Sequence, residues 1–204
     1  MHKTIFKAGK RYNFSDYFKM SYPTEEILAE FGYSFALEKL ELPLAREIEQ
    51  QVIDYLRTSY YALIGKVPLH SETAKRELLI APLLQSVVKS VDVKLNIEYP
   101  MDLDDKLSGS IDYLFRARHE LVVIEAKKSD MERGFSQLAV EMIAVDKYEG
   151  EGTPNVLYGA VTVGEMWRFA VLERDAKRLL KDVHTFRFPE DLEQLFAILT
   201  GILA

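Results

Sequence analysis

The stretch SIDYLFRARHELVVIEAK, residues 110–127, reads as two β-strands joined by a tight turn at Arg118 and His119. Both halves are rich in the aliphatic, β-branched and aromatic residues that suit a pleated sheet. Residues 121–124 are an uninterrupted apolar run, as in a strand buried in a core. The run ends in Glu125 and Lys127, which share one face of the strand because successive side chains alternate. Taken alone, a core strand that ends in two charges on one face is typical of a strand that leaves the core with both side chains in solvent; a functional site is the alternative.

The predicted hairpin brings a second carboxylate to that face. A two-residue turn at positions 118–119 places Arg116 opposite Leu121 and Asp112 opposite Glu125, since loop length sets the register. Cross-strand partners lie on the same face, with Cβ atoms about 4.5–5.5 Å apart, and like charges held there repel each other. A divalent cation relieves that repulsion, and hard cations such as Mg²⁺ take oxygen ligands. The hairpin therefore predicts a cation site formed by Asp112 and Glu125.

Two neighbouring groups add to this site. The main-chain carbonyl of Ala126 offers another oxygen ligand. A lysine beside a bound cation, here Lys127, orients or deprotonates a water molecule, or stabilises negative charge on a phosphate. These are the parts that metal-assisted hydrolysis of a phosphodiester requires.

The pattern resembles the signature of the PD-(D/E)XK nuclease superfamily: Asp112 is followed thirteen residues later by Glu-Ala-Lys at positions 125–127. Members of that superfamily carry a glutamate on the helix before the strands, and Glu77 stands at that place. Many also carry a glutamine on the helix after the lysine, where Gln137 stands. The proline of the family name is absent, because Ile111 precedes Asp112.

The resemblance covers roughly residues 70–175 and implies both a fold and an activity. The fold is α/β, with a restriction-endonuclease-like core in which helices flank a mixed central sheet, in the order α-β-β-β-α-β-β. The activity is hydrolysis of DNA by a nuclease with Mg²⁺ or Mn²⁺ as cofactor. In this domain organisation, residues 1–69 are a helical and extended decoration and residues 70–204 are the nuclease-like part of one compact domain.

The resemblance also assigns roles to single residues. Asp112 and Glu125 bind the metal, with Glu77 and the Ala126 carbonyl as further ligands. Lys127 positions or activates the attacking water. Gln137, by the same resemblance, steers the lysine or a phosphate.

Hydrophobic periodicity predicts the elements around the hairpin. Pro43 marks the start of a helix that Gly65 ends, and Pro82 breaks or kinks the helical stretch that contains it. The predicted helices cover residues 24–32, 43–65, 69–90, 129–148 and 189–204, and the further strands cover residues 91–100, 156–164 and 166–174.

Composition limits the classes of function. The chain has 204 residues and no cysteine, which excludes disulfides and thiolate metal sites and favours a cytoplasmic location. No apolar run approaches the roughly 18–20 residues needed to span a bilayer, so no membrane partner is expected. The net charge of −6 disfavours a protein that coats nucleic acid by bulk electrostatics, but not an enzyme that contacts DNA locally.

Two other interpretations fit the same residues. One is a catalytically silent nuclease-like domain that binds nucleic acid or assembles with protein, including a homodimer through the C-terminal helix. Apolar residues of that helix pack either on the core or on a second subunit; they are Leu192, Leu195, Phe196, Leu199, Ile202 and Leu203. The other interpretation is a structural α/β domain in which the acidic hairpin is coincidental.

Overall fold

The computed structural model describes residues 4–117, 120–125, 130–149 and 154–204, with the backbone alone for residues 120–125 and 149. Its centre is a mixed sheet in the order β1-β7-β6-β5-β4-β3-β2, with β8 paired to β6. The β1–β7 and β4–β5 pairs are parallel and the other pairs are antiparallel. The strands are β1 (Ser34–Glu38), β2 (Lys94–Asp102), β3 (Ser108–Arg116), β4 (Glu120–Glu125), β5 (Val156–Thr162), β6 (Met166–Glu173), β7 (Arg178–Asp182) and β8 (Phe186–Arg187).

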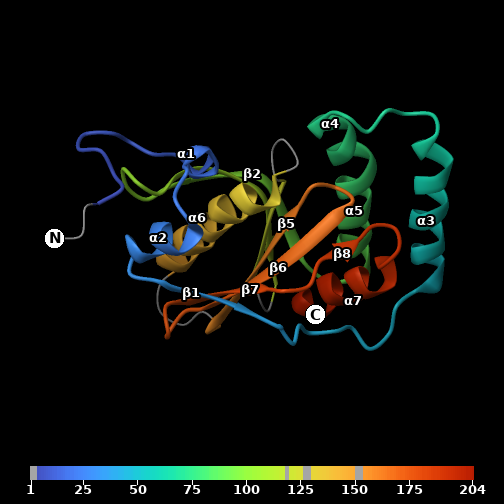
Figure 1. The fold of residues 1–204 in the computed structure, drawn as a ribbon. Coiled ribbons are helices and arrows are strands. Elements are labelled where there is room, and N and C mark those ends of the chain that lie inside the picture. Colours follow the sequence, from blue (N-terminus) through green and yellow to red (C-terminus); the bar gives the residue numbers. More distant parts are fainter. Residues whose placement is uncertain (1–3, 118–119, 126–129, 150–153) are drawn as a thin grey trace.

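Helices cover both faces of this sheet (Figure 1). One face carries α1 (Phe14–Lys19), α2 (Thr24–Ala29) and α6 (Met131–Glu149). The other face carries α3 (Gln50–Ile64), α4 (Glu72–Lys75), the π-helical turn η1 (Arg76–Ile80), α5 (Ala81–Ser90) and α7 (Leu192–Leu203). The predicted α/β class, with helices flanking a mixed sheet, is confirmed. Among the described residues, no helix is long and apolar enough to cross a membrane.

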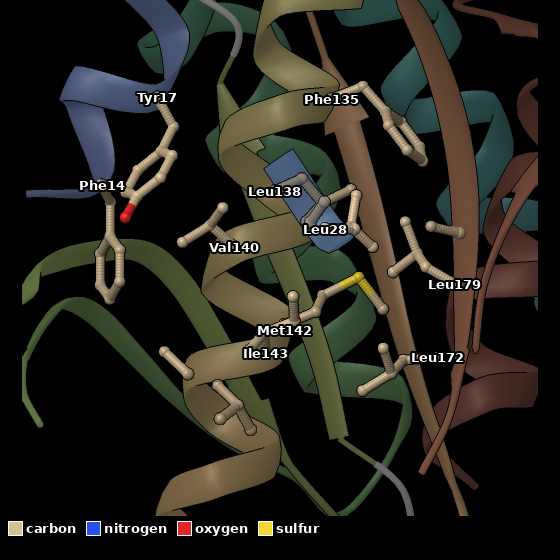
Figure 2. Close-up of a cluster of buried hydrophobic side chains, with 14 of the residues drawn as sticks. Phe14, Tyr17, Leu28, Phe135, Leu138, Val140, Met142, Ile143, Leu172 and Leu179 are labelled. Atoms are coloured by element: carbon tan, nitrogen blue, oxygen red, sulfur yellow. The ribbon is translucent and has the colours of Figure 1, made fainter. Parts of the chain in front are cut away.

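The first core lies between the sheet and α6. Figure 2 shows Leu138 and Met142 of α6 turned toward Leu172 and Leu179 of the sheet. Val140 lies on the other side of α6, close to Tyr17 of α1, and is also buried. The helix is therefore covered from outside by the N-terminal segment, which explains why its buried residues extend beyond a single stripe.

The N-terminal segment is part of this core. β1 adds a parallel strand to β7, and a buried polar network ties the segment to α6. The Tyr33 hydroxyl donates to Asp146, which also pairs with Arg174 at 3.1 Å. Burial, and then the hydrogen bond to Asp146, raise the pKa of Tyr33. Residues that the sequence suggests as decoration thus join the sheet and the core.

The second core lies between the sheet and α5 with α7. Trp167 and Phe169 of β6 are fully buried there, beside Leu83 of α5. The six apolar residues of the C-terminal helix are all buried in this core. They therefore pack on the chain's own sheet, which is the first of the two alternatives for that helix.

The predicted helix from Pro43 is wrong in its first turns, because α3 begins only at Gln50. Tertiary contacts hold the preceding segment extended. The backbone N–H of Ala45 donates to the carbonyl of Ala197 in α7 at 2.9 Å. Gly201, one turn further along α7, leaves room for this backbone to approach.

Pro82 produces a π-helical turn in place of a simple kink. Proline has no N–H, so in a regular helix the carbonyl of Leu78 would lose its partner. Here Pro82 lies in the first turn of α5, and the N–H of Ala81 donates to the carbonyl of Arg76, five residues back. Such π-turns occur frequently at functional sites, and this one carries Arg76 and Glu77.

We expect Gly201→Ala to lower the free energy of unfolding by about 1–3 kcal/mol, the range for overpacking. A Cβ at this position would lie 2.6 Å from the backbone of Leu44 and Ala45, which cannot give way as a side chain can. Urea denaturation measures the change. Gly65→Ala is the control, because nothing lies within 4 Å of a Cβ there; equal effects of the two substitutions would contradict the prediction.

Candidate functional site around Asp112

The predicted register of the β3–β4 hairpin is wrong by one residue. Arg116 pairs with Glu120 and Tyr113 with Val123, so Ala117 belongs to the connection rather than to the ladder. The connection therefore spans three positions instead of two, and register follows loop length. Asp112 is not opposite Glu125 in this ladder, and on a regular strand the shift would move its side chain to the other face.

A break in the neighbouring β2–β3 ladder changes that outcome. The two strands pair regularly on both sides, but the ladder skips Glu98 and Asp112. Glu98 has a φ of +52°, in the left-handed region that residues other than glycine seldom occupy. The strand pair is therefore irregular at the position of the predicted metal ligand.

The break shifts the alternation of side chains by one residue. Leu95 and Phe115, on one side of the break, pack in the second core, whereas Met101 and Ile111, on the other side, pack in the first core. Regular alternation would put these four odd-numbered positions on one face. Asp112, at the break, faces the layer of α4, η1 and α5, as its contact with that layer shows.

That contact is with Arg76 of η1. Arg76 Nη2 lies 3.9 Å from Asp112 Oδ1, and Arg76 Nη1 lies 3.6 Å from Glu98 Oε1. The side chain of Asp112 is 23% exposed and that of Glu98 is 71% exposed. Two carboxylates and one guanidinium from three separate elements thus meet at the break.

The turn between β5 and β6 lies against the same helical segment. Gly164 has a φ of +90°, and a Cβ there would come within 3.1 Å of Lys75 and Leu79. Two residues earlier, Thr162 ends β5 and pairs in parallel with Glu125, the last residue of β4. The α4–η1 segment therefore lies beside Asp112 on one side and beside the turn that follows β5 on the other.

Three predicted site residues lie wholly or partly outside the described part of the chain. Glu125 is described by its backbone alone, while Ala126 and Lys127 lie outside the described residues. The convergence of Asp112, Glu125 and Lys127 stays a prediction. The backbone does bring the end of β4 to the edge of the sheet where the Gly164 turn meets the α4–η1 segment.

Glu77 and Gln137 differ from each other in exposure and in their contacts. Glu77 is exposed on η1, and it is the preceding residue, Arg76, that reaches Asp112. Gln137 is only 5% exposed, and its Nε2 donates to Oε1 of the fully buried Glu141 at 2.8 Å. Gln137 therefore forms a buried hydrogen bond within α6.

The donor set suits a hard cation but is incomplete in the described part of the chain. Among the described side chains, no group of three or more histidines, aspartates and glutamates is arranged to hold a metal ion. Asp112 and Glu98 supply carboxylate oxygens, the ligands that Mg²⁺ and Mn²⁺ prefer. The guanidinium of Arg76 lies beside both carboxylates and offsets part of their negative charge.

No family model matches the chain, and no match is found among curated proteins. The evidence for the site is therefore its geometry.

Sequence reasoning missed Arg76 and Glu98. The signal for Arg76 was Pro82, six residues later in the same helical stretch, because a proline there forces an irregular turn upstream. Glu98 carried no signal, since a charged residue in an alternating strand ordinarily indicates an exposed position.

We expect Glu98→Val to destabilise the fold by about 1–2 kcal/mol, because a β-branched side chain is strained at positive φ. Lys94→Val, at an exposed position of the same strand, should be neutral or slightly stabilising, since valine favours ordinary strands. Urea unfolding of both variants compares the two positions. Equal changes in the free energy of unfolding for the two variants would contradict the prediction that the positive φ of residue 98 disfavours a β-branched side chain.

Gln137→Met should lower the free energy of unfolding by about 1–3 kcal/mol, the range for removing one partner of a buried hydrogen bond. The substitution keeps the volume but removes the donor to Glu141. The double variant Gln137→Met with Glu141→Met serves as the control. Its loss should be smaller than the sum of the losses in the two single variants, because both single substitutions break the same hydrogen bond; strictly additive losses would contradict this bond.

Proposed function

We propose that this chain is a metal-dependent nuclease that hydrolyses DNA, built on a restriction-endonuclease-like core. The observation that supports this most is the position of Asp112. It lies at a break in the sheet, on the face of the α4–η1 segment, and the end of β4 that carries Glu125 comes to the same segment. The element order α5, β2, β3, β4, α6, β5, β6 also agrees with the order that such a core requires.

In this proposal, Asp112 and Glu125 bind Mg²⁺ or Mn²⁺, with the Ala126 carbonyl and Glu77 as further ligands. The bound cation would polarise the scissile phosphate and lower the pKa of the attacking water. Lys127 holds that water in line or takes its proton. The apolar run of β4 is a rigid support for these residues, as a preorganised site requires.

Local charge supports a DNA substrate despite the net charge of −6. Arg76 lies at the site itself. Arg133, which is half exposed, lies on the first turn of α6. A guanidinium beside the site suits a phosphate backbone, because it can donate two parallel hydrogen bonds to phosphate oxygens.

A second candidate is a catalytically silent domain of the same architecture that binds nucleic acid or protein. One observation favours it: Arg76 already compensates the charge of Asp112, so this carboxylate does not need a metal to be stable in the fold. This candidate predicts binding without cleavage.

The deciding experiment is cleavage of labelled duplex and single-stranded DNA with Mg²⁺ or Mn²⁺. We expect cleavage by the wild type and a loss of at least about 100-fold in Asp112→Asn and Lys127→Ala, as for general acid–base or charge-stabilising groups. Asp102→Asn is the matched control, since this exposed carboxylate lies on the same strand as Glu98 and pairs with Arg11. A wild type no more active than Lys127→Ala would refute the nuclease and leave the binding domain.

A further inference from the structure

A cleft of about 610 Å³ lies at the carboxyl ends of the parallel strands β1 and β7. Three segments line it: the chain that follows β1, the chain that follows β7, and α7 with the residue before it. Figure 1 shows the chain that leaves β1 passing α7 on its way to α3. Small-molecule sites have volumes of roughly 300–1,000 Å³, and in open α/β sheets they lie outside the carboxyl ends of the strands. The cleft has both properties.

Main-chain hydrogen bonds hold the walls of this cleft in place. The N–H of Val183 donates to the carbonyl of Glu38 at 2.9 Å, which joins the two segments that follow the strands. The N–H of Ala45 donates to the carbonyl of Ala197 at 2.9 Å, which joins the first segment to α7. The cleft also has an apolar wall, formed by Leu40, Leu42, Leu44, Phe186 and Ile198.

The cleft contains an oriented imidazole, that of His184. The carboxylate of Asp182, which is only 1% exposed, lies 3.2 Å from His184 Nδ1 and accepts from the backbone N–H of the same residue at 3.0 Å. A carboxylate only accepts hydrogen bonds, so Nδ1 carries the proton between them. In the neutral ring Nε2 is then an acceptor, and the side chain is half exposed. A ligand that meets Nε2 therefore offers an N–H or O–H donor.

The charges around the cleft favour a positive ligand. Three carboxylates line it, those of Glu41, Asp182 and Asp191, against the single ammonium group of Lys39. Arg187 lies just outside and donates to Asp191 through its Nε at 3.3 Å. Even with Arg187 counted, the carboxylates outnumber the cations. Clefts lined by an excess of one charge concentrate ligands of the opposite charge.

We propose that this cleft is a ligand site for a small organic amine in its ammonium form. The ammonium group donates to Nε2 of His184 in the field of the carboxylates, and the carbon body of the amine packs on the apolar wall. Asp182 is a positioning residue, because it holds the ring and its tautomer. This site goes beyond the proposed nuclease and does not depend on it, since it shares no residue with the predicted metal site.

Three probes with the same carbon body test the class of ligand: phenylbutylamine, phenylbutanol and phenylbutyrate. Each is titrated into the full chain by calorimetry and by nuclear magnetic resonance at about pH 8, where a primary amine is still protonated. We expect the amine to bind at least about fivefold more tightly than the carboxylate, with the alcohol between them. Equal affinities for the three probes, tighter binding of phenylbutyrate, or no binding of the amine overturns the inference.

The role of the imidazole is tested by His184→Ala, which should weaken binding of phenylbutylamine about tenfold, as for loss of a hydrogen bond to a charged group. His70→Ala is the matched control, because His70 is also exposed but lies outside the cleft. Urea unfolding of each variant shows that it folds. If His184→Ala binds the amine as the wild type does, or if His70→Ala has the same effect, the inference is overturned.

The role of charge is tested by two substitutions with opposite expected effects. Lys39→Met removes the cation and should tighten phenylbutylamine binding about threefold, whereas Glu41→Gln removes an anion and should weaken it by a similar factor. Loss of folding cannot produce both changes. Glu25→Gln, an exposed position on α2, is the control and should have no effect. Changes in the same direction for Lys39→Met and Glu41→Gln overturn the inference. None of these measurements involves DNA, so the nuclease stands or falls separately.

Discussion

The break in the β2–β3 ladder at Glu98 and Asp112 is the constraint on which the site depends. It costs about 1 kcal/mol or more, because Glu98 adopts a left-handed backbone. The surrounding structure offsets that cost, since the break lets one strand pair serve two cores. Phe115 reaches the core under α5 and α7, while Ile111 of the same strand reaches the core under α6. A regular strand would leave one of these two residues in the wrong layer.

α6 is buried on both of its sides and organises the first core, on the face of the sheet that carries α1 and α2. Leu138 and Met142 pack on the sheet, while Val140 is covered by the N-terminal helices (Figure 2). The parallel pairing of β1 with β7 and the network of Tyr33, Asp146 and Arg174 tie those helices to the sheet. α6 begins at Met131, four residues after Lys127 in the sequence. A site at the edge of the sheet is therefore supported from both layers.

Local sequence predicted most elements correctly, because their periodicity agrees with their packing. The hairpin, α6, the β5–β6 pair and α7 all lie close to their predicted ranges. The failures arose where a distant segment decides the local conformation. Residues 43–49 have a helical pattern, but Ala45 bonds to Ala197 of α7 and stays extended. β7 was missed because its five residues acquire their role only by pairing with β1 and β6.

The sequence by itself determined the α/β class, the strand that ends in Glu125, and Asp112 as a carboxylate in a strand. These follow from hydrophobic period and residue type, which act over a few neighbouring positions. Only the tertiary structure decided the register of the hairpin, the face of Asp112 and the identity of its partners. A loop one residue longer shifts every pair of the hairpin, and the break at Glu98 and Asp112 shifts the alternation of side chains within β3. Arg76 and Glu98 meet Asp112 because three elements far apart in the chain pack at one point, and no local pattern encodes such a contact.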